Sequence, residues 1–476
     1  MEFLYFDYNA TTPLEESVHK VISHHLKHSW ANPSSNNILG KVAKSVIEEA
    51  RAHLAKLIDC NDQSNIIFTS GGTESNNTIV YSVLKNFQKT KDKIYKAQAG
   101  VESNHLNSPN GFNEVYCANG NHNTQIFNEN MNIPHVITSC IEHDSILLLL
   151  QDLQNKGKLS VTYLPISPIS GKILISDLVS ALQHNTRLIT IMLANNETGV
   201  IQPIKELSQT LNDFCHNPNS QCSINRSDII IHTDASQAIG KIPISIIELG
   251  VDSLTLTGHK FYGPRIGALY YSSHLKFHNN LNPLLLGGGQ EGGLRAGTEN
   301  TALIAGLGEA ARLAYMSNQA LNPTGKDFSY SLETITAYLI KRLFNTFGPV
   351  INFNNLQFLS TDFDYSKEKE NNFIDFEQLY LDNHRGHLLP NTLSVSFESD
   401  SVKHEWGCMI LEKCSKLMAS TGAACHAGKY EPSKVLLNSG MNVSTAKKSI
   451  RLSTGRFTTQ QQVDDAIEDL RLALNF

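Results

Sequence analysis

The sequence predicts an α/β protein with one large, mostly parallel sheet and a smaller α+β lobe at its C-terminal end. Short apolar runs alternate with helix-period segments through most of the first 320 of the 476 residues. Most of these runs are apolar throughout, as in strands that are buried on both faces of a parallel sheet. Alternation of strands and helices is typical of open α/β sheets. Beyond residue 320 the pattern changes, which indicates the second lobe.

Individual elements follow from the same patterns. After the strand expected over 65–69, the segment 74–84 repeats apolar residues on one face and predicts a helix. In the second lobe we expect a helix over 330–347 and a strand over 392–397. The strands expected in the large sheet are 65–69, 135–139, 187–194, 228–233 and 252–257.

The domain organisation follows from the change of pattern. We expect a large domain over residues 15–318, and a small domain made of residues 1–14 and 319–476. Two segments interrupt the alternation and are expected to be solvated insertions. The first, about 88–132, is rich in Asn, Lys and Gly, and the second, about 354–378, is more acidic.

Composition and charge exclude several classes of protein. Hydrophobic residues make up 41% of the chain and charged residues 18%, so a large core is expected and wholesale disorder is not. The net charge of −6 argues against nucleic acid or an anionic membrane as the main partner. No apolar run approaches the ~20 residues of a membrane helix. The first residues, with Glu2 and Asp7, do not resemble a signal peptide.

The eight cysteines are scattered along the chain, and none forms the paired CxxC pattern of a zinc site. In a long chain without a signal peptide, reduced thiols are expected. We therefore expect no metal site and a cytosolic location.

Candidate site residues follow the expected strands, and ligands of open α/β sheets bind beyond the carboxyl ends of the strands. The first strand is followed by Ser70, Gly71, Gly72 and Thr73 at the start of a helix. Glycines allow close approach to a ligand, and a helix start offers free N–H groups to a phosphate. The alternative is a plain glycine turn with Thr73 as the helix N-cap.

Three further strand ends carry polar residues. Asp234 could hold a protonated pyridine nitrogen, or it could be an N-cap. Lys260 could be a nucleophilic amine for a Schiff base, or it could belong to a surface basic loop. Asn195 or Asn196 could bind a ring hydroxyl, or form an Asx-turn. Together the phosphate cup, carboxylate, amide and amine fit one cofactor, pyridoxal phosphate.

A series of longer motifs occurs in a fixed order along the chain. These are FDYNATTP, NPSS, FTSGGTESNN, EHDSI, NNETGV, HTDASQAIGK, GHKFYGPRIGALY, GGGQEGGLRAGTEN, GAACH and SIRLSTGRFTT. The sequence thereby resembles the class V aminotransferase-fold enzymes, in particular the family of cysteine desulfurases and selenocysteine lyases. The resemblance covers nearly the whole chain except the two insertions. It implies the type I fold of pyridoxal-phosphate enzymes.

The resemblance also implies roles for single residues. Lys260 would form the Schiff base, Asp234 would meet the pyridine nitrogen, and His143 would stack on the ring. Gln237 and Asn196 would contact the ring hydroxyl. The phosphate would be bound by Gly72, Thr73, Thr257 and His259, and by Thr298 of the other subunit, which implies a homodimer. Considered without the resemblance, His143 could be an ordinary core histidine.

Substrate-binding and catalytic residues are implied in the same way. Asn32 and Arg451 would hold the substrate carboxylate, a task to which the fork of an arginine is suited. Cys425 matches the catalytic cysteine of the family. The alternatives are a surface strand residue for Arg451 and a buried structural cysteine for Cys425.

Three features favour a selenocysteine lyase, which releases selenium from L-selenocysteine and leaves L-alanine, over a cysteine desulfurase. One is that the motifs GGGQE and GPRIGALY resemble those of lyases, and the other two are single positions. Asp144 follows the ring-stacking histidine where many desulfurases have Lys, and His426 follows Cys425 as in lyases. A carboxylate at Asp144 would disfavour a thiolate, whereas a selenol is already ionised; alternatively, Asp144 is an exposed helix cap. The runner-up is a cysteine desulfurase that acts on L-cysteine and forms a persulfide on Cys425. A catalytically silent binding partner is a third reading. Either enzyme could deliver selenium or sulfur to an acceptor protein.

Overall fold

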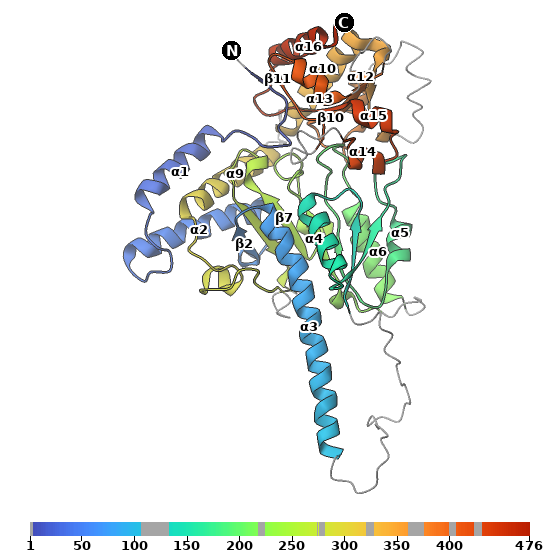
Figure 1. Ribbon diagram of the computed structural model, residues 1–476. Helices are drawn as coiled ribbons and strands as arrows, with labels where there is room; N and C mark the ends of the chain where they lie inside the picture. The colour runs from blue at the N-terminus through green and yellow to red at the C-terminus, as the bar shows by residue number, and fades with distance from the viewer. Residues whose placement is uncertain are drawn as a thin grey trace.

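The computed structural model describes residues 3–105, 133–217, 224–273, 275, 281–319, 328–359, 376–398, 406–422 and 431–476. These residues form a large part around one sheet and a smaller part above it, as Figure 1 shows. Cys425 and His426 lie outside the described residues.

The large part is built on a seven-stranded sheet in the order β2-β8-β7-β6-β5-β3-β4. β8 pairs antiparallel with both of its neighbours, while the other pairs are parallel. All strands except β8 therefore point the same way, and their carboxyl ends meet at one edge. The strands are β2 (Ile66–Thr69), β3 (His135–Ser139), β4 (Ser160–Leu164), β5 (Thr186–Thr190), β6 (Ile230–Asp234), β7 (Ser253–Thr257) and β8 (Gly267–Tyr271).

The five strands expected from the sequence are present, and the α/β class with a mostly parallel sheet is confirmed. The strand expected over 187–194 is too long, because β5 ends at Thr190. Ile191 N and Leu193 N still donate to carbonyl groups of the β6 segment, so the buried apolar run continues without regular pairing. The strand expected over 228–233 begins only at Ile230, after a 3₁₀ turn. β4 and β8 were not expected.

Helices cover the sheet (Figure 1). α1 and α2 pack against α9, and Gly308 of α9 allows a close approach, since a Cβ there would lie 2.5 Å from Ala50 Cα. Among the described helices, none is both long and apolar enough to cross a membrane. The helices are α1 (Glu16–His28), α2 (Ile38–Leu57), α3 (Gly72–His105), α4 (Asp144–Asn155), α5 (Ile175–Ala181), α6 (Ile204–His216), α7 (Ile246–Leu249) and α9 (Thr301–Gln319).

α3 is much longer than the helix expected over 74–84. It continues to His105 and projects away from the sheet in Figure 1. Residues 88–105, expected to belong to an insertion without periodicity, are thus helical. The segment contains Lys, Gln and Ala, which favour helix, and helix propagation from a packed first half needs no apolar face. The rest of the expected insertion, 106–132, lies outside the described residues.

The small part has an antiparallel sheet in the order β12-β10-β9 and a separate parallel pair, β1 with β11. Its core is separate from the two apolar clusters of the large part and includes Phe6 from the N-terminal arm. Its elements are β1 (Leu4–Tyr5), α10 (Phe328–Phe347), β9 (Ile351–Phe353), α12 (Phe376–Asn383), β10 (Thr392–Phe397), α13 (Gly407–Lys413), β11 (Leu417–Met418), α14 (Lys434–Asn438), α15 (Val443–Lys448), β12 (Ser449–Ser453) and α16 (Gln460–Leu474). The exact domain boundaries, 15–318 and 1–14 with 319–476, stay a prediction.

The second expected insertion, 354–378, begins inside this core rather than in solvent. Leu356, Phe358 and Leu359 are buried and pack in the apolar cluster of the small part. The acidic residues that made the segment look solvated lie later in the sequence, and 360–375 lie outside the described residues.

Candidate active site

One cavity lies at the carboxyl edge of the large sheet, between the two parts of the molecule. Its volume is about 270 Å³. Residues that follow β2, β3, β5, β6 and β7 line it, as expected for strands that point the same way. The small part contributes Arg451 of β12, and the N-terminal arm contributes Asn9. The expected site residues on its wall are Gly72, Thr73, His143, Asn196, Asp234, Gln237, Thr257, His259, Lys260 and Arg451.

Lys260 ends a 3₁₀ turn that directly follows β7. A Cβ at Gly258, the first residue of this turn, would lie 2.5 Å from Pro264 O, so glycine is needed for the chain to turn here. The side chain of Lys260 is half-buried, and Nζ donates to Asn9 O over 2.7 Å. The alternative of an ordinary surface loop is therefore wrong.

Asp234 is the last residue of β6 and is nearly buried. Its Oδ1 accepts from Ser236 N over 2.9 Å, and its Oδ2 accepts from Asn76 Nδ2 over 2.8 Å. A turn follows rather than a helix, so Asp234 does not cap a helix. The two donors fix the carboxylate at the cavity wall.

The glycine-rich segment after β2 leads directly into α3, which begins at Gly72. Thr73 is thus inside the helix and is not its N-cap. A Cβ at Gly72 would lie 3.3 Å from Ser236 Oγ, a tight contact. The start of a long helix, with glycine in its first turn, faces the cavity and suits an anion.

His259 lies beside Lys260, and its Nδ1 is 3.1 Å from Thr11 Oγ1. Burial, and to a lesser degree the charges of Lys260 and Arg265, lower the pKa of His259 to about 4. The imidazole is therefore neutral near pH 7, and can donate or accept a hydrogen bond without adding charge.

His143 and Asp144 stand at the start of α4. His143 is the N-cap of this helix, with Nδ1 accepting from Ser145 N over 3.1 Å, and it is exposed. It is therefore not a core histidine. Asp144 is the first helical residue, not the cap, and lines an adjoining cavity of about 630 Å³ that also includes His143. Gly422 and Glu431, which flank the undescribed segment with Cys425, line the same cavity.

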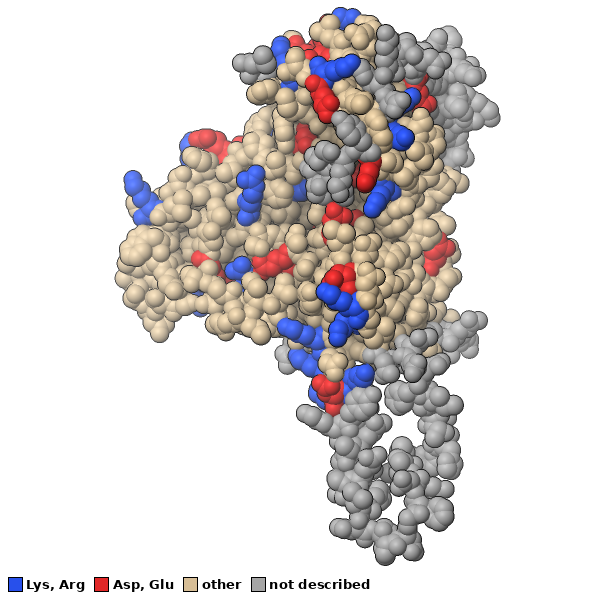
Figure 2. Space-filling model, in the orientation of Figure 1, with Lys and Arg blue, Asp and Glu red and all other residues tan. Residues whose placement is uncertain are grey.

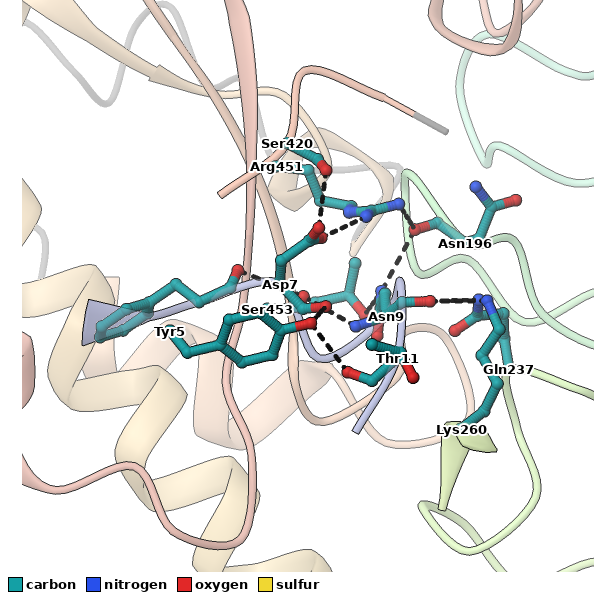
Figure 3. A network of polar contacts seen from close by, with 12 residues as sticks. Tyr5, Asp7, Asn9, Thr11, Asn196, Gln237, Lys260, Ser420, Arg451 and Ser453 are labelled. Carbon is teal, nitrogen blue, oxygen red and sulfur yellow. Dashed lines mark hydrogen bonds and ion pairs between the residues drawn. The ribbon is translucent and has the colours of Figure 1, made fainter. Parts of the chain in front are cut away.

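Arg451 is buried, with 3% of its side chain exposed, so it is not a surface strand residue. NH1 donates to Asn196 O over 3.0 Å, and NH2 lies 2.5 Å from Asp7 Oδ1 (Figure 3). Asn195, not Asn196, makes the Asx-turn, because its Oδ1 accepts from Glu197 N.

Besides Asp144, which lines the adjoining cavity, two of the expected site residues that the structure describes do not line this cavity. Asn32 is exposed, and its Oδ1 accepts from Ser34 N over 2.9 Å. Thr298 is exposed and lines a different cavity of about 270 Å³, together with Ser70 and Arg265. In this single chain, the structure does not bring either one to the cavity of Lys260.

Asn9 is a site residue that the sequence reasoning missed. Its carbonyl oxygen accepts from Lys260 Nζ and from Gln237 Nε2, the latter over 3.0 Å, and its Nδ2 donates to Asn196 O over 3.1 Å (Figure 3). Lys241 Nζ donates to Asn9 Oδ1 over 2.7 Å. The motif FDYNATTP was the available signal, but nothing local assigns its asparagine to a distant lysine.

Two buried ionisable groups stand behind the wall. Burial raises the pKa of Glu142 to about 8, and its Oε1 accepts from Ser139 Oγ and Met192 N. Burial lowers the pKa of Lys241 well below its usual value, and the charges of Lys260 and Arg451 lower it further.

The comparisons with known proteins identify the family. Residues 4–110 and 122–343 match the family described as Aminotransferase class-V. The chain belongs to this family. It is 40% identical over 472 residues to selenocysteine lyase of Xenopus tropicalis, covering 99% of this chain and 93% of the relative. It is 33% identical over 471 residues to cysteine desulfurase IscS of Dictyoglomus turgidum, covering 98% and 93%.

Solved structures of the same fold are also similar. A NifS-like protein is 25% identical with a TM-score of 0.72, and each chain is covered over 100% of its length. The structure titled SspA in complex with cysteine is 28% identical with a TM-score of 0.65, covering 96% of this chain and 99% of that one.

Because it belongs to this family, the chain is a pyridoxal-phosphate enzyme. The cavity of Lys260 fits that cofactor. Its wall offers an amine at Lys260, a carboxylate at Asp234 held by two donors, and the start of α3 for a phosphate. These are the groups that a pyridine ring with an aldehyde and a phosphate requires.

Proposed function

We propose that the protein is a selenocysteine lyase, which cleaves the Cβ–selenium bond of L-selenocysteine. The observation that carries this proposal is a difference in similarity. Five relatives named selenocysteine lyase are 39–40% identical over 99% of this chain, whereas three named cysteine desulfurase are 31–33% identical. L-selenocysteine contains the atoms of L-alanine plus one selenium atom, so release of elemental selenium needs no other reactant. Release as selenide would require a reductant such as a thiol.

When bound, pyridoxal phosphate supplies an electron sink for the α-carbon of the substrate. Lys260 would hold the cofactor through its Nζ, and the same amine, when free, would take the α-proton of the substrate. The 2.7 Å contact from Nζ to Asn9 O supports this role, because a carbonyl oxygen stabilises the protonated amine.

The other wall residues orient the reactants. Asp234 would hold the ring nitrogen as a protonated group, and Asn196 and Gln237 would contact the ring oxygen. Gly72, Thr73, Thr257 and His259 bind the phosphate, and Arg451 binds the substrate carboxylate. His143 would stack on the ring, a role that its exposed position on the cavity wall as N-cap of α4 supports.

The preference for selenium is proposed to depend on Asp144 and Cys425. Asp144 lines the cavity that adjoins the Lys260 cavity, so its negative charge disfavours ionisation of a thiol nearby. A selenol is already ionised at neutral pH and is a better leaving group. Cys425 is therefore required more for the release of sulfur than for the release of selenium.

We also propose a homodimer, in which Thr298 serves the phosphate of the other subunit. Apolar side chains on the large part support it, since Trp30, Ile38 and Leu286 are 73%, 73% and 81% exposed. In Figure 2, charged side chains are scattered among uncharged ones over α1 and α2 on the visible face. Asn32 lies in the loop between these helices. We further propose that the protein is cytosolic and that it passes the selenium to an acceptor protein.

The test is a comparison of kcat/KM for L-selenocysteine and L-cysteine. We expect a preference for L-selenocysteine above about 200-fold, because shape alone supplies only ~10–200-fold between such similar side chains. Cys425→Ala is expected to reduce the reaction of cysteine more than that of selenocysteine. Asp144→Lys is expected to raise activity on cysteine. Asp152→Lys makes the same charge change on the exposed surface of α4 and is the matched control.

Comparable wild-type rates on the two amino acids would assign the chain to the cysteine desulfurases instead. A purified protein without cofactor absorbance or activity on either substrate would support the reading as a silent binding partner.

A further inference from the structure

The arginine proposed to bind the substrate carboxylate already has a carboxylate partner within the chain. Asp7 Oδ1 lies 2.5 Å from Arg451 NH2, and the two side chains are 16% and 3% exposed. The other oxygen, Asp7 Oδ2, accepts from Ser420 Oγ over 2.8 Å (Figure 3). Both oxygens of Asp7 are thus held, one of them by the guanidinium.

The backbone around Asp7 is held as firmly as its side chain. Asp7 forms a parallel β-bridge with Ser453, and its carbonyl oxygen accepts from Tyr5 Oη over 3.0 Å. Asn9, two residues later, is held at the cavity wall by Lys260 and Lys241. The N-terminal arm therefore places Asp7 against Arg451 through contacts on either side of it.

The guanidinium keeps capacity for a second acceptor. NH1 donates to Asn196 O over 3.0 Å, while Nε is buried and has no hydrogen-bond partner among the described residues. Arg451 also lines the cavity of Lys260, so a ligand in that cavity can reach it. A carboxylate that arrives there meets a guanidinium that already pairs with the carboxylate of Asp7.

We propose that Asp7 sets the affinity of Arg451 for the carboxylate of an amino-acid ligand. Asp7 holds the guanidinium in place while the cavity has no ligand, and it weakens the attraction for a second carboxylate, so that the product can leave. The proposal rests on the proposed role of Arg451 as the carboxylate site.

Both effects follow from elementary electrostatics. A buried arginine without a counter-charge destabilises the folded chain, and Asp7 offsets that cost. The same negative charge repels a ligand carboxylate that binds to the same guanidinium. Tight binding of the ground state does not raise kcat. A lower affinity of Arg451 for the carboxylate is therefore compatible with rapid turnover.

The test uses the cofactor-loaded enzyme and L-alanine, the product of carbon–selenium and carbon–sulfur cleavage alike. Asp7→Asn keeps the size of the side chain and an acceptor for Arg451, but removes the charge. We expect its dissociation constant for L-alanine, followed by the visible absorbance of the cofactor, to fall roughly tenfold. KM for the substrate should fall as well, while kcat does not rise. Glu16→Gln removes one charge from an exposed site on α1 and is the matched control.

Thermal melting gives a second readout that does not depend on activity. Without ligand, Asp7→Asn should melt below the wild type, because Arg451 loses its counter-charge. Saturating L-alanine should raise the melting temperature of the variant more than that of the wild type. If Asp7→Asn does not fold, Asp7→Ser serves instead, since it also removes the charge.

An affinity for L-alanine in Asp7→Asn that is unchanged or weaker than in the Glu16→Gln control overturns the proposal. Arg451→Gln separates this result from failure of the proposed function. If Arg451→Gln binds L-alanine as tightly as the wild type, the role of Arg451 itself is wrong. If Arg451→Gln loses affinity while Asp7→Asn is unchanged, only the role of Asp7 is wrong.

Discussion

At the scale of single residues, burial determines which groups carry charge. His135 of β3 is 1% exposed, and its two ring nitrogens each lie 2.9 Å from a threonine hydroxyl, of Thr186 and Thr162. Burial lowers the pKa of His135 to about 4. The folded chain therefore keeps this histidine neutral at a pH where the unfolded chain protonates it.

The sign of the pH dependence follows from linkage. Between pH 6.5 and 4 the unfolded state binds more protons at His135, so the free energy of unfolding falls as the pH falls. The decrease in the free energy of unfolding that His135 causes is negligible at pH 7. It reaches at most about 3 kcal/mol below pH 4. His135→Gln loses hydrogen bonds and is less stable at pH 7, but its deficit relative to the wild type should narrow towards pH 4. Urea unfolding at several pH values measures this.

His19→Gln, on the exposed face of α1, is the control, and its stability should follow the wild type at every pH. If the free energy of unfolding of His135→Gln stays below that of the wild type by the same amount from pH 7 to pH 4, the lowered pKa of His135 is contradicted.

The sequence predicted much of the cavity at this scale because its residues stand at strand ends. Gly72, Asp234 and Lys260 each follow an apolar run, and parallel strands bring their carboxyl ends together. Asn9 and Asp7 could not be predicted in the same way. Their partners Lys260 and Arg451 are 251 and 444 positions away in the sequence, and only the folded chain brings them together.

At the scale of elements, the apolar runs predicted strands well, whereas the polar segments were predicted poorly. β3 and β10 have the bounds expected from the sequence. The sequence of the second half of α3 shows little apolar periodicity and was expected to be an insertion, since periodicity reports burial and not helix formation itself. The segment 354–359 is the opposite case, because its buried residues were grouped with the acidic stretch that follows.

Close packing between α2 and α9 leads to a prediction about two glycines of one helix. A Cβ at Gly308 would meet Ala50 Cα at 2.5 Å and Ala50 Cβ at 2.6 Å, which are backbone-bound atoms that cannot turn away. A Cβ at Gly306 would meet Ile22 Cγ1 at 2.5 Å and Ile22 Cδ1 at 2.7 Å, which are side-chain atoms that a change of rotamer can move away. Alanine gains about 1 kcal/mol over glycine in a helix, while overpacking costs typically 1–3 kcal/mol.

Gly308→Ala should therefore destabilise the protein by about 2 kcal/mol, and Gly306→Ala by less than about 1 kcal/mol. Equilibrium unfolding in urea measures both variants, and Gly306→Ala is the matched control on the same helix. If the two variants are equally stable, α2 and α9 can move apart at Gly308 without a cost in free energy, and the prediction is wrong.

At the scale of the whole molecule, the large and the small part each have an apolar core, yet one segment of the large part exposes several large apolar side chains. Trp30, Ile38, Leu39 and Val42 lie in or next to the loop between α1 and α2 and are 42–73% exposed. Monomeric proteins rarely expose so many large apolar side chains close together in the sequence. Thr298 faces a cavity separate from that of Lys260, as a residue that serves another subunit would.

The proposed homodimer can be tested through this surface. We expect the wild type to sediment as a dimer, and Ile38→Glu to shift towards the monomer, because a buried unpaired charge opposes association. Loss of the dimer should also weaken binding of pyridoxal phosphate, since Thr298 of the other subunit no longer contacts the phosphate. Leu472→Glu, with the same change at a 60% exposed position on α16, should stay dimeric and retain its cofactor. A wild type that sediments as a monomer with full activity would exclude the shared site. If Ile38→Glu is monomeric but binds the cofactor as tightly as the wild type, the proposed dimer interface stands, and the proposed role of Thr298 in the phosphate site is wrong.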